Sequence, residues 1–145
     1  MVRMRASGVA EFTLRPRVGE GLVPAPYEDA VVVEVEATGR CRGDWRAWAG
    51  HDDGITLPHI PGVDVAGTVD ALGDGVDNRK VGDRVIGFLP FVTDGASAEF
   101  VVVDADALAP APPSIPLADS AAPGVVGLTA CQALCVPSEL TSRRR

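Results

Sequence analysis

Glycine and proline divide this chain into short segments, and that division limits the secondary structure that it can form. There are 16 glycines and 12 prolines among its 145 residues. In residues 30–37, the valines at 31, 33 and 35 alternate with Val32, Glu34 and Glu36. This alternation predicts a strand with one solvated face. Further strands are predicted by the apolar runs at residues 9–14, 65–72, 81–87 and 98–103. Many short strands at this spacing are typical of a β-barrel or β-sandwich.

One short helix is predicted between the strands at residues 30–37 and 65–72. Asp44 is placed to cap it, Trp45 and Trp48 share one of its faces, and Gly50 ends it. Four large aromatic side chains, two in this helix and two after the strand at residues 81–87, are expected to pack in the core rather than to enclose a substrate: Trp45, Trp48, Phe88 and Phe91.

The C-terminal third is predicted to change from extended to helical structure. Residues 109–116 are rich in proline and predict a stiff connector. Residues 117–136 predict a helix with a break near Pro123. Cys131 and Cys135 lie one turn apart on it and are interpreted as part of an apolar face rather than as a metal pair. Residues 137–145 are polar and are expected to be disordered.

Composition excludes several classes of partner. A hydrophobic content of 46% and a charged content of 23% fit one domain with a substantial core. The formal charge of −7 argues against binding to nucleic acid or to anionic membranes. There is no apolar run of about 20 residues that would span a bilayer. Three unevenly spaced cysteines favour a reducing compartment, so we expect a cytoplasmic location.

A set of short motifs, in one order along the chain, resembles the N-terminal GroES-like catalytic domain of the medium-chain dehydrogenases and reductases. The motifs are the valine-rich strand, Ala37-Thr38-Gly39, the Cys-x-x-Asp turn at Cys41, Leu57-Pro58-His59-Ile60-Pro61-Gly62, Ala66-Gly67-Thr68-Val69, Val81-Gly82-Asp83-Arg84-Val85, Ala98-Glu99-Phe100-Val101 and Gly127-Leu128-Thr129-Ala130. The resemblance implies a mainly β fold: a partly open GroES-like β-barrel with short helices and a C-terminal helix. The domain would occupy residues 1–116, followed by the helix at residues 117–136, which in relatives leads into a nucleotide-binding domain.

Members of this family transfer hydride between NAD or NADP and an alcohol, a carbonyl compound or an enone. In the zinc branch the metal is a Lewis acid held by three protein ligands, and the resemblance places those ligands at Cys41, Val63 and Val125. Two of these side chains are hydrocarbons, so Cys41 is the only retained candidate ligand and we expect no zinc. Asp64 does not simply replace Val63, because neighbouring side chains on a strand point to opposite faces.

The remaining sequence features are closer to the zinc-free quinone-reductase branch. Gly43 stands where zinc enzymes usually carry a hydroxyl residue for proton transfer. We therefore take Cys41, Asp44 and Asp64 as candidate catalytic residues and Arg42 as a candidate contact for the cofactor pyrophosphate. Each has a simpler interpretation: Cys41 as a small buried hydrophobe, Asp44 as a helix cap and Arg42 as a solvated surface residue.

The sequence contains no Gly-x-Gly-x-x-Gly turn of the kind that seats a dinucleotide. We therefore expect that this chain alone binds no cofactor, and two hypotheses follow. It is the catalytic portion of a truncated NAD(P)-dependent oxidoreductase and inactive alone, or it is a stand-alone barrel that binds a separate dinucleotide-binding chain or another copy of itself. The sequence does not decide between substrates or between NAD and NADP.

Overall fold

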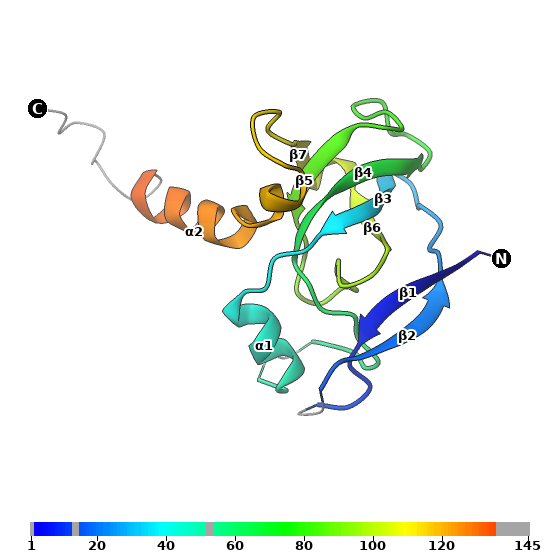
Figure 1. The fold of residues 1–145 in the computed structure, drawn as a ribbon, viewed down its shortest axis with the longest axis vertical. Helices are drawn as coiled ribbons and strands as arrows, with labels where there is room; N and C mark the ends of the chain where they lie inside the picture. The colour runs from blue at the N-terminus through cyan, green and yellow to red at the C-terminus, as the bar shows by residue number, and fades with distance from the viewer. Residues whose placement is uncertain (1, 13–14, 52–53, 136–145) are drawn as a thin grey trace, which may run out of the picture.

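The computed structural model describes residues 2–12, 15–51 and 54–135. Its elements are mainly strands, which confirms the predicted fold class (Figure 1). In chain order they are β1 (Arg3–Gly8), β2 (Arg17–Leu22), β3 (Ala30–Ala37), α1 (Arg42–Trp48), β4 (Asp64–Leu72), β5 (Arg84–Phe88), β6 (Phe100–Asp104), η1 (Ala105–Ala107), β7 (Leu108–Pro110), η2 (Ala118–Ala121) and α2 (Gly124–Cys135). Among the described residues, no helix has the length and apolar composition that crossing a membrane requires.

The strands form two antiparallel sheets. The larger has five strands in the order β6-β3-β4-β5-β7, and β1 and β2 make a separate two-stranded sheet. The sheets are joined where Ser7 N–H donates to the Ser97 carbonyl and Glu99 N–H donates to the Arg5 carbonyl. Within the described chain β6 and β7 are the edges of the larger sheet and do not pair with each other, so the barrel is partly open.

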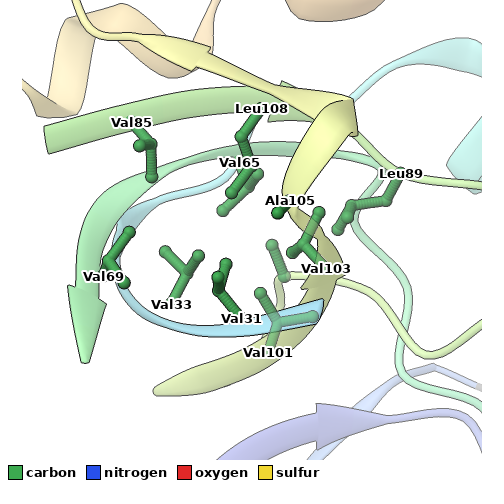
Figure 2. Close-up of a cluster of buried hydrophobic side chains, with 11 residues drawn as sticks. Val31, Val33, Val65, Val69, Val85, Leu89, Val101, Val103, Ala105 and Leu108 are labelled. Atoms are coloured by element: carbon green, nitrogen blue, oxygen red, sulfur yellow. The ribbon is translucent and has the colours of Figure 1, made fainter. Parts of the chain in front are cut away.

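A valine-rich core holds the larger sheet together (Figure 2). Its valines come from β3, β4, β5 and β6: Val31, Val33, Val65, Val69, Val85, Val101 and Val103. Burying one such side chain contributes about 1.5–3 kcal/mol to folding. β4 is the central strand of this sheet, and its first residue, Asp64, is buried. Asp64 belongs to the candidate active site described below.

The apolar patterns located most strands of the larger sheet to within a few residues. β3 spans the predicted residues, and β4 begins one residue early, at Asp64. β5 begins at Arg84 rather than at residue 81, because Gly82 has a φ of +91° and belongs to a turn whose N–H donates to the Val69 carbonyl. β6 begins at Phe100 rather than at residue 98, because the Glu99 N–H is already bonded to β1.

The strand predicted at residues 9–14 is wrong. Val9 forms only an isolated bridge with His59, and residues 13–14 lie outside the described residues. The N-terminal strands are instead β1 and β2. In β1 the apolar alternation is limited to Met4 and Ala6, and β2 is rich in glycine and charged residues. These strands pair with each other and with residues 97–99, so long-range hydrogen bonds rather than local pattern determine them.

The helical segments also need correction in places. Trp45 is 52% exposed and Trp48, Phe88 and Phe91 are only half-buried, so these aromatic residues are not the core. The proline-rich connector is partly a strand, β7, which pairs with β5. The helix expected after it has the predicted break, at Ala122 and Pro123, which separates η2 from α2. The predicted polar tail at residues 137–145 lies outside the described residues.

Candidate active site

Cys41 is the residue immediately before α1, in an extended conformation. Its N–H donates to Oδ2 of Asp44 at 2.8 Å. The carboxylate of Asp44 therefore reaches back from the third helical residue, as in a capping box. The prediction that Asp44 caps this helix is confirmed, although Asp44 does so from the third helical position and Cys41 is the N-cap residue.

Asp44 also connects this turn to the segment that enters β4. Its side chain is buried, and Oδ1 accepts the N–H groups of Gly62 at 3.0 Å and Val63 at 3.3 Å. A buried carboxylate is tolerated when backbone donors replace its lost water, and here three donors do so. Asp44 thus holds the backbone at positions 41 and 63 at the same time.

The thiol of Cys41 is half-buried beside an aromatic ring. Burial is the main cause that raises the pKa of this thiol, so it is a neutral S–H group near pH 7. A Cβ added at Gly43 would collide with the ring of Phe91 and would lie 3.2 Å from the Cys41 sulfur. The ring of Phe91 therefore occupies the space into which a hydroxyl side chain at position 43 would extend.

Asp64 makes the corresponding connection to α2. Its side chain is buried, and Oδ1 accepts the N–H of Val125 at 2.6 Å from the first turn of that helix. The Thr38 hydroxyl donates to the Asp64 carbonyl at 2.7 Å. Burial raises the pKa of Asp64, the bond from Val125 opposes that shift, and the charge of Asp44 adds to it.

Two glycines make room for the Asp64 carboxylate. A Cβ at Gly39 would lie 2.8 Å from Oδ2, and a Cβ at Gly124 would overlap Oδ1. The close approach of both backbones to one side chain is the reason that glycine is required here. The sequence interpretation did not identify this role of Gly39 and Gly124, since each approaches a residue that is distant in the sequence, Asp64, and such a contact leaves no local signal.

The three positions at which the resemblance would place zinc ligands therefore have backbone N–H groups that donate to two neighbouring carboxylates. Asp44 binds the N–H groups of Cys41 and Val63, and Asp64 binds that of Val125. We call these three positions and two carboxylates the ligand frame. Its residues do not fit zinc, because two of its side chains are isopropyl groups without a donor atom. Across residues 2–12, 15–51 and 54–135 no group of three or more His, Cys, Asp or Glu side chains could hold a metal ion.

Neither histidine completes the frame. His59 is buried, pairs with Val9 through the backbone, and has Nδ1 3.7 Å from Oδ1 of Asp94. Burial lowers the pKa of His59, so its ring is neutral near pH 7. His51 is exposed and lies in a shallow hollow on α1.

That hollow concentrates positive charge in an acidic protein. It has a volume of about 300 Å³ and is lined by Arg42, Trp45, Arg46 and His51. Nearby, the Arg40 guanidinium lies 5.5 Å from the centre of the Trp48 ring. The sequence interpretation singled out Arg42 alone, although the spacing of four residues between Arg42 and Arg46 places both on one helix face. The hollow has the charge and the guanidinium groups that suit phosphate oxygens.

Comparison with known proteins places these features in a family. Residues 27–113 match the family model described as "Alcohol dehydrogenase GroES-like domain". The chain is 38% identical over 121 residues to the chloroplast envelope quinone oxidoreductase homolog of Arabidopsis thaliana, covering 81% of this chain and 37% of that protein. It is 36% identical over 136 residues to the quinone oxidoreductase of Rattus norvegicus, covering 90% of this chain and 40% of that protein.

Solved structures give the same result. An alcohol dehydrogenase superfamily protein from Novosphingobium aromaticivorans superposes with a TM-score of 0.89 at 33% identity, over 94% of this chain and 42% of that one. The quinone oxidoreductase of Coxiella burnetii superposes with a TM-score of 0.87 at 25% identity, over 92% of this chain and 44% of that one. The fold is thus that of a GroES-like domain of the alcohol dehydrogenase superfamily.

The chain belongs to the medium-chain dehydrogenase/reductase family and corresponds to the N-terminal domain of its members. It spans less than half the length of the curated relatives described above.

Proposed function

We propose that this chain is the substrate-binding half of a zinc-independent, quinone-reductase-like oxidoreductase that uses NADPH or NADH. The observation that carries the proposal is the ligand frame, in which backbone N–H groups are bonded to Asp44 and Asp64 while the side chains of Val63 and Val125 offer no donor atom to a metal. The similarity to quinone oxidoreductases from plants and mammals supports the same branch of the family. An enone or quinone suits such a site better than an alcohol, because it needs no Lewis acid to release a proton from a hydroxyl group.

Within this proposal the candidate residues have different tasks. The neutral thiol of Cys41 lies at the surface of the turn and can donate a weak hydrogen bond to the substrate oxygen. Asp44 and Asp64 are buried and bonded to backbone, so they act as positioning residues that hold Cys41 and the start of α2. The ring of Phe91 supplies an apolar wall beside the thiol.

The cofactor is only partly accommodated by the described residues. A reduced nicotinamide, when bound, supplies the hydride. Arg42 offers a guanidinium charge for the phosphates, but the sequence has no glycine-rich turn to seat them at a helix N-terminus. We therefore propose that a separate dinucleotide-binding domain completes the site and that this chain alone is inactive.

The test joins this chain to the dinucleotide-binding portion of the Arabidopsis relative. The fusion is expected to oxidise NADPH in the presence of a quinone or enone and to keep its activity in a zinc chelator, whereas the chain alone is expected to show neither turnover nor saturable NADPH binding. In the fusion, Arg42→Gln is expected to raise the KM for NADPH severalfold, and Arg17→Gln, on the exposed strand β2, is the matched control. Turnover by the chain alone, or a fusion that binds NADPH but reduces no quinone or enone, would contradict the proposal.

The alternative is that the chain is a stand-alone binding or oligomerisation module. The observation that favours it is α2, which extends away from the sheets (Figure 1). This helix has no buried residue and exposes Val126, Leu128 and Leu134. An apolar helix of this kind is stable in water when another surface covers it. Sedimentation equilibrium separates the two ideas: the alternative requires a discrete dimer that Leu128→Glu dissociates, whereas the first proposal requires no self-association.

A further inference from the structure

A cavity of about 520 Å³ lies on another part of the molecule, between the two-stranded sheet, β6 and the loop that follows β5. Met4 of β1 and Leu22 of β2 form one side, and all five residues of β6 contribute to the other. None of Cys41, Asp44, Asp64 and Val125 lines it. Its volume is in the range of pockets that enclose small organic molecules, about 300–1,000 Å³.

The lining combines aliphatic and aromatic side chains. Leu22, Leu89 and Met4 give it an aliphatic floor, and the rings of Tyr27, Phe88 and Phe100 also line it. Aromatic faces attract cations as well as apolar groups, because their quadrupole is negative at the face. A ligand with an aromatic body therefore has matching surface here.

The charged residues that line this cavity are both acidic. Asp104 accepts the Tyr27 hydroxyl with Oδ1 at 2.7 Å, and Asp94 accepts the Ile60 N–H with Oδ1 at 2.8 Å. Among the described residues, no hydrogen bond is made to Oδ2 of either carboxylate. No lysine or arginine is among the lining residues. Each carboxylate thus keeps one oxygen available to a ligand.

The groups that face these carboxylates do not neutralise them near pH 7. The hydrogen bond to Asp104 raises the pKa of Tyr27, so the phenol stays a neutral donor. His59 faces Asp94, and burial lowers the pKa of that imidazole, so it is neutral as well. The whole chain has a formal charge of −7, which favours the approach of a cation.

We propose that this cavity binds a small organic cation with an aromatic body and a single ammonium group, at a site separate from the candidate active site. The aromatic body occupies the space between Leu22, Phe88 and Phe100, and the ammonium group pairs with the carboxylate of Asp104. This site is independent of the proposed oxidoreductase function.

The test uses three probes that share one body and differ in charge: 4-phenylbutylamine, 4-phenylbutan-1-ol and 4-phenylbutanoate. The methyl group of Met4 lines the cavity, and the sequence has only two methionines, so methyl-labelled methionine gives a resolved NMR reporter. The amine is expected to shift the Met4 methyl signal saturably and to bind about tenfold more tightly than the alcohol, a difference of about 1.4 kcal/mol. The carboxylate is expected to bind most weakly.

Variants of exposed carboxylates give the matched comparison. Asp104→Asn is expected to reduce the affinity for the amine severalfold towards that of the alcohol. Asp77→Asn, in a neighbouring acidic hollow outside the cavity, is expected to leave it unchanged. Equal affinity of the native chain for the three probes, or an unmoved Met4 signal, would overturn the proposal whether or not the variants fold. A folded Asp104→Asn variant with undiminished affinity would do the same.

Discussion

Asp64 Oδ1 lies 2.6 Å from the backbone nitrogen of Val125, although 61 residues separate them in the chain. The bond joins the first residue of β4 to the first turn of α2. Together with the hydrogen bonds that Asp44 accepts, it holds the turn before α1, the start of β4 and the start of α2 around one small region. The geometry of the candidate site therefore depends on two buried carboxylates rather than on a metal.

Removing the charge of Asp44 is expected to destabilise the fold. Asp44→Asn replaces an acceptor oxygen by an NH₂ group that faces backbone donors, and leaving such groups unsatisfied costs about 1.5–3 kcal/mol. Urea denaturation followed by circular dichroism measures the change. Asp70→Asn, an exposed carboxylate on β4, is the control and is expected to change the stability by less than about 0.5 kcal/mol. Equal effects of the two substitutions would show that Asp44 does not hold the frame.

The stability of the protein is expected to depend on pH through Asp64. Because burial raises its pKa in the folded state, the folded protein binds this proton more tightly than the unfolded chain does. The stabilisation is complete below the unfolded pKa of about 3.9 and is lost as the pH rises through the folded pKa. The loss is about 1.4 kcal/mol for each unit by which the folded pKa exceeds the unfolded one.

The variant Asp64→Asn isolates this effect because its side chain does not titrate. The free energy of unfolding of the native chain, minus that of Asp64→Asn, is expected to fall as the pH rises from about 4 towards 7. A difference that rises over the same range would mean that the folded pKa is depressed, and the description of Asp64 would then be wrong.

Two glycines in one helix are expected to respond to alanine with opposite signs. Gly127→Ala meets only Pro123, at 3.4 Å, and is expected to stabilise α2 by about 0.5–1 kcal/mol through helix propensity. Gly124→Ala places a methyl group on the Asp64 carboxylate and is expected to destabilise the protein by about 1–3 kcal/mol. Thermal unfolding of both variants checks the signs; stabilisation by Gly124→Ala would show that the approach to Asp64 is not close.

The sequence predicted those parts of the fold that depend on side-chain alternation. β3 and β4 bury valines on the core face, and that burial both forms the strands and leaves a periodic pattern. β1 and β2 contain mainly charged, small and glycine residues and are held by pairing with each other, so their pattern carried no comparable signal.

The candidate site was predictable residue by residue but not as an arrangement. The family resemblance assigned the three ligand positions to Cys41, Val63 and Val125, and that assignment stays a prediction. The N–H of Gly62 donates to Asp44, and the N–H of Val125 donates to Asp64. These bonds join residues far apart in sequence, so only the fold reveals them. Asp44 lies three residues after Cys41, which is the spacing of a capping box. In that motif Cys41 is the N-cap residue and Asp44 is the third helical residue.

Metal analysis of the native chain and of the double variant Val63→His/Val125→Cys tests the central claim most directly. If the frame holds three ligand positions together and lacks only the donor atoms, the native protein contains no stoichiometric zinc. The double variant then binds about one zinc ion per chain, and Cys41→Ser weakens that binding. Stoichiometric zinc in the native protein, or a folded double variant that binds no more zinc than the native chain, would contradict the account.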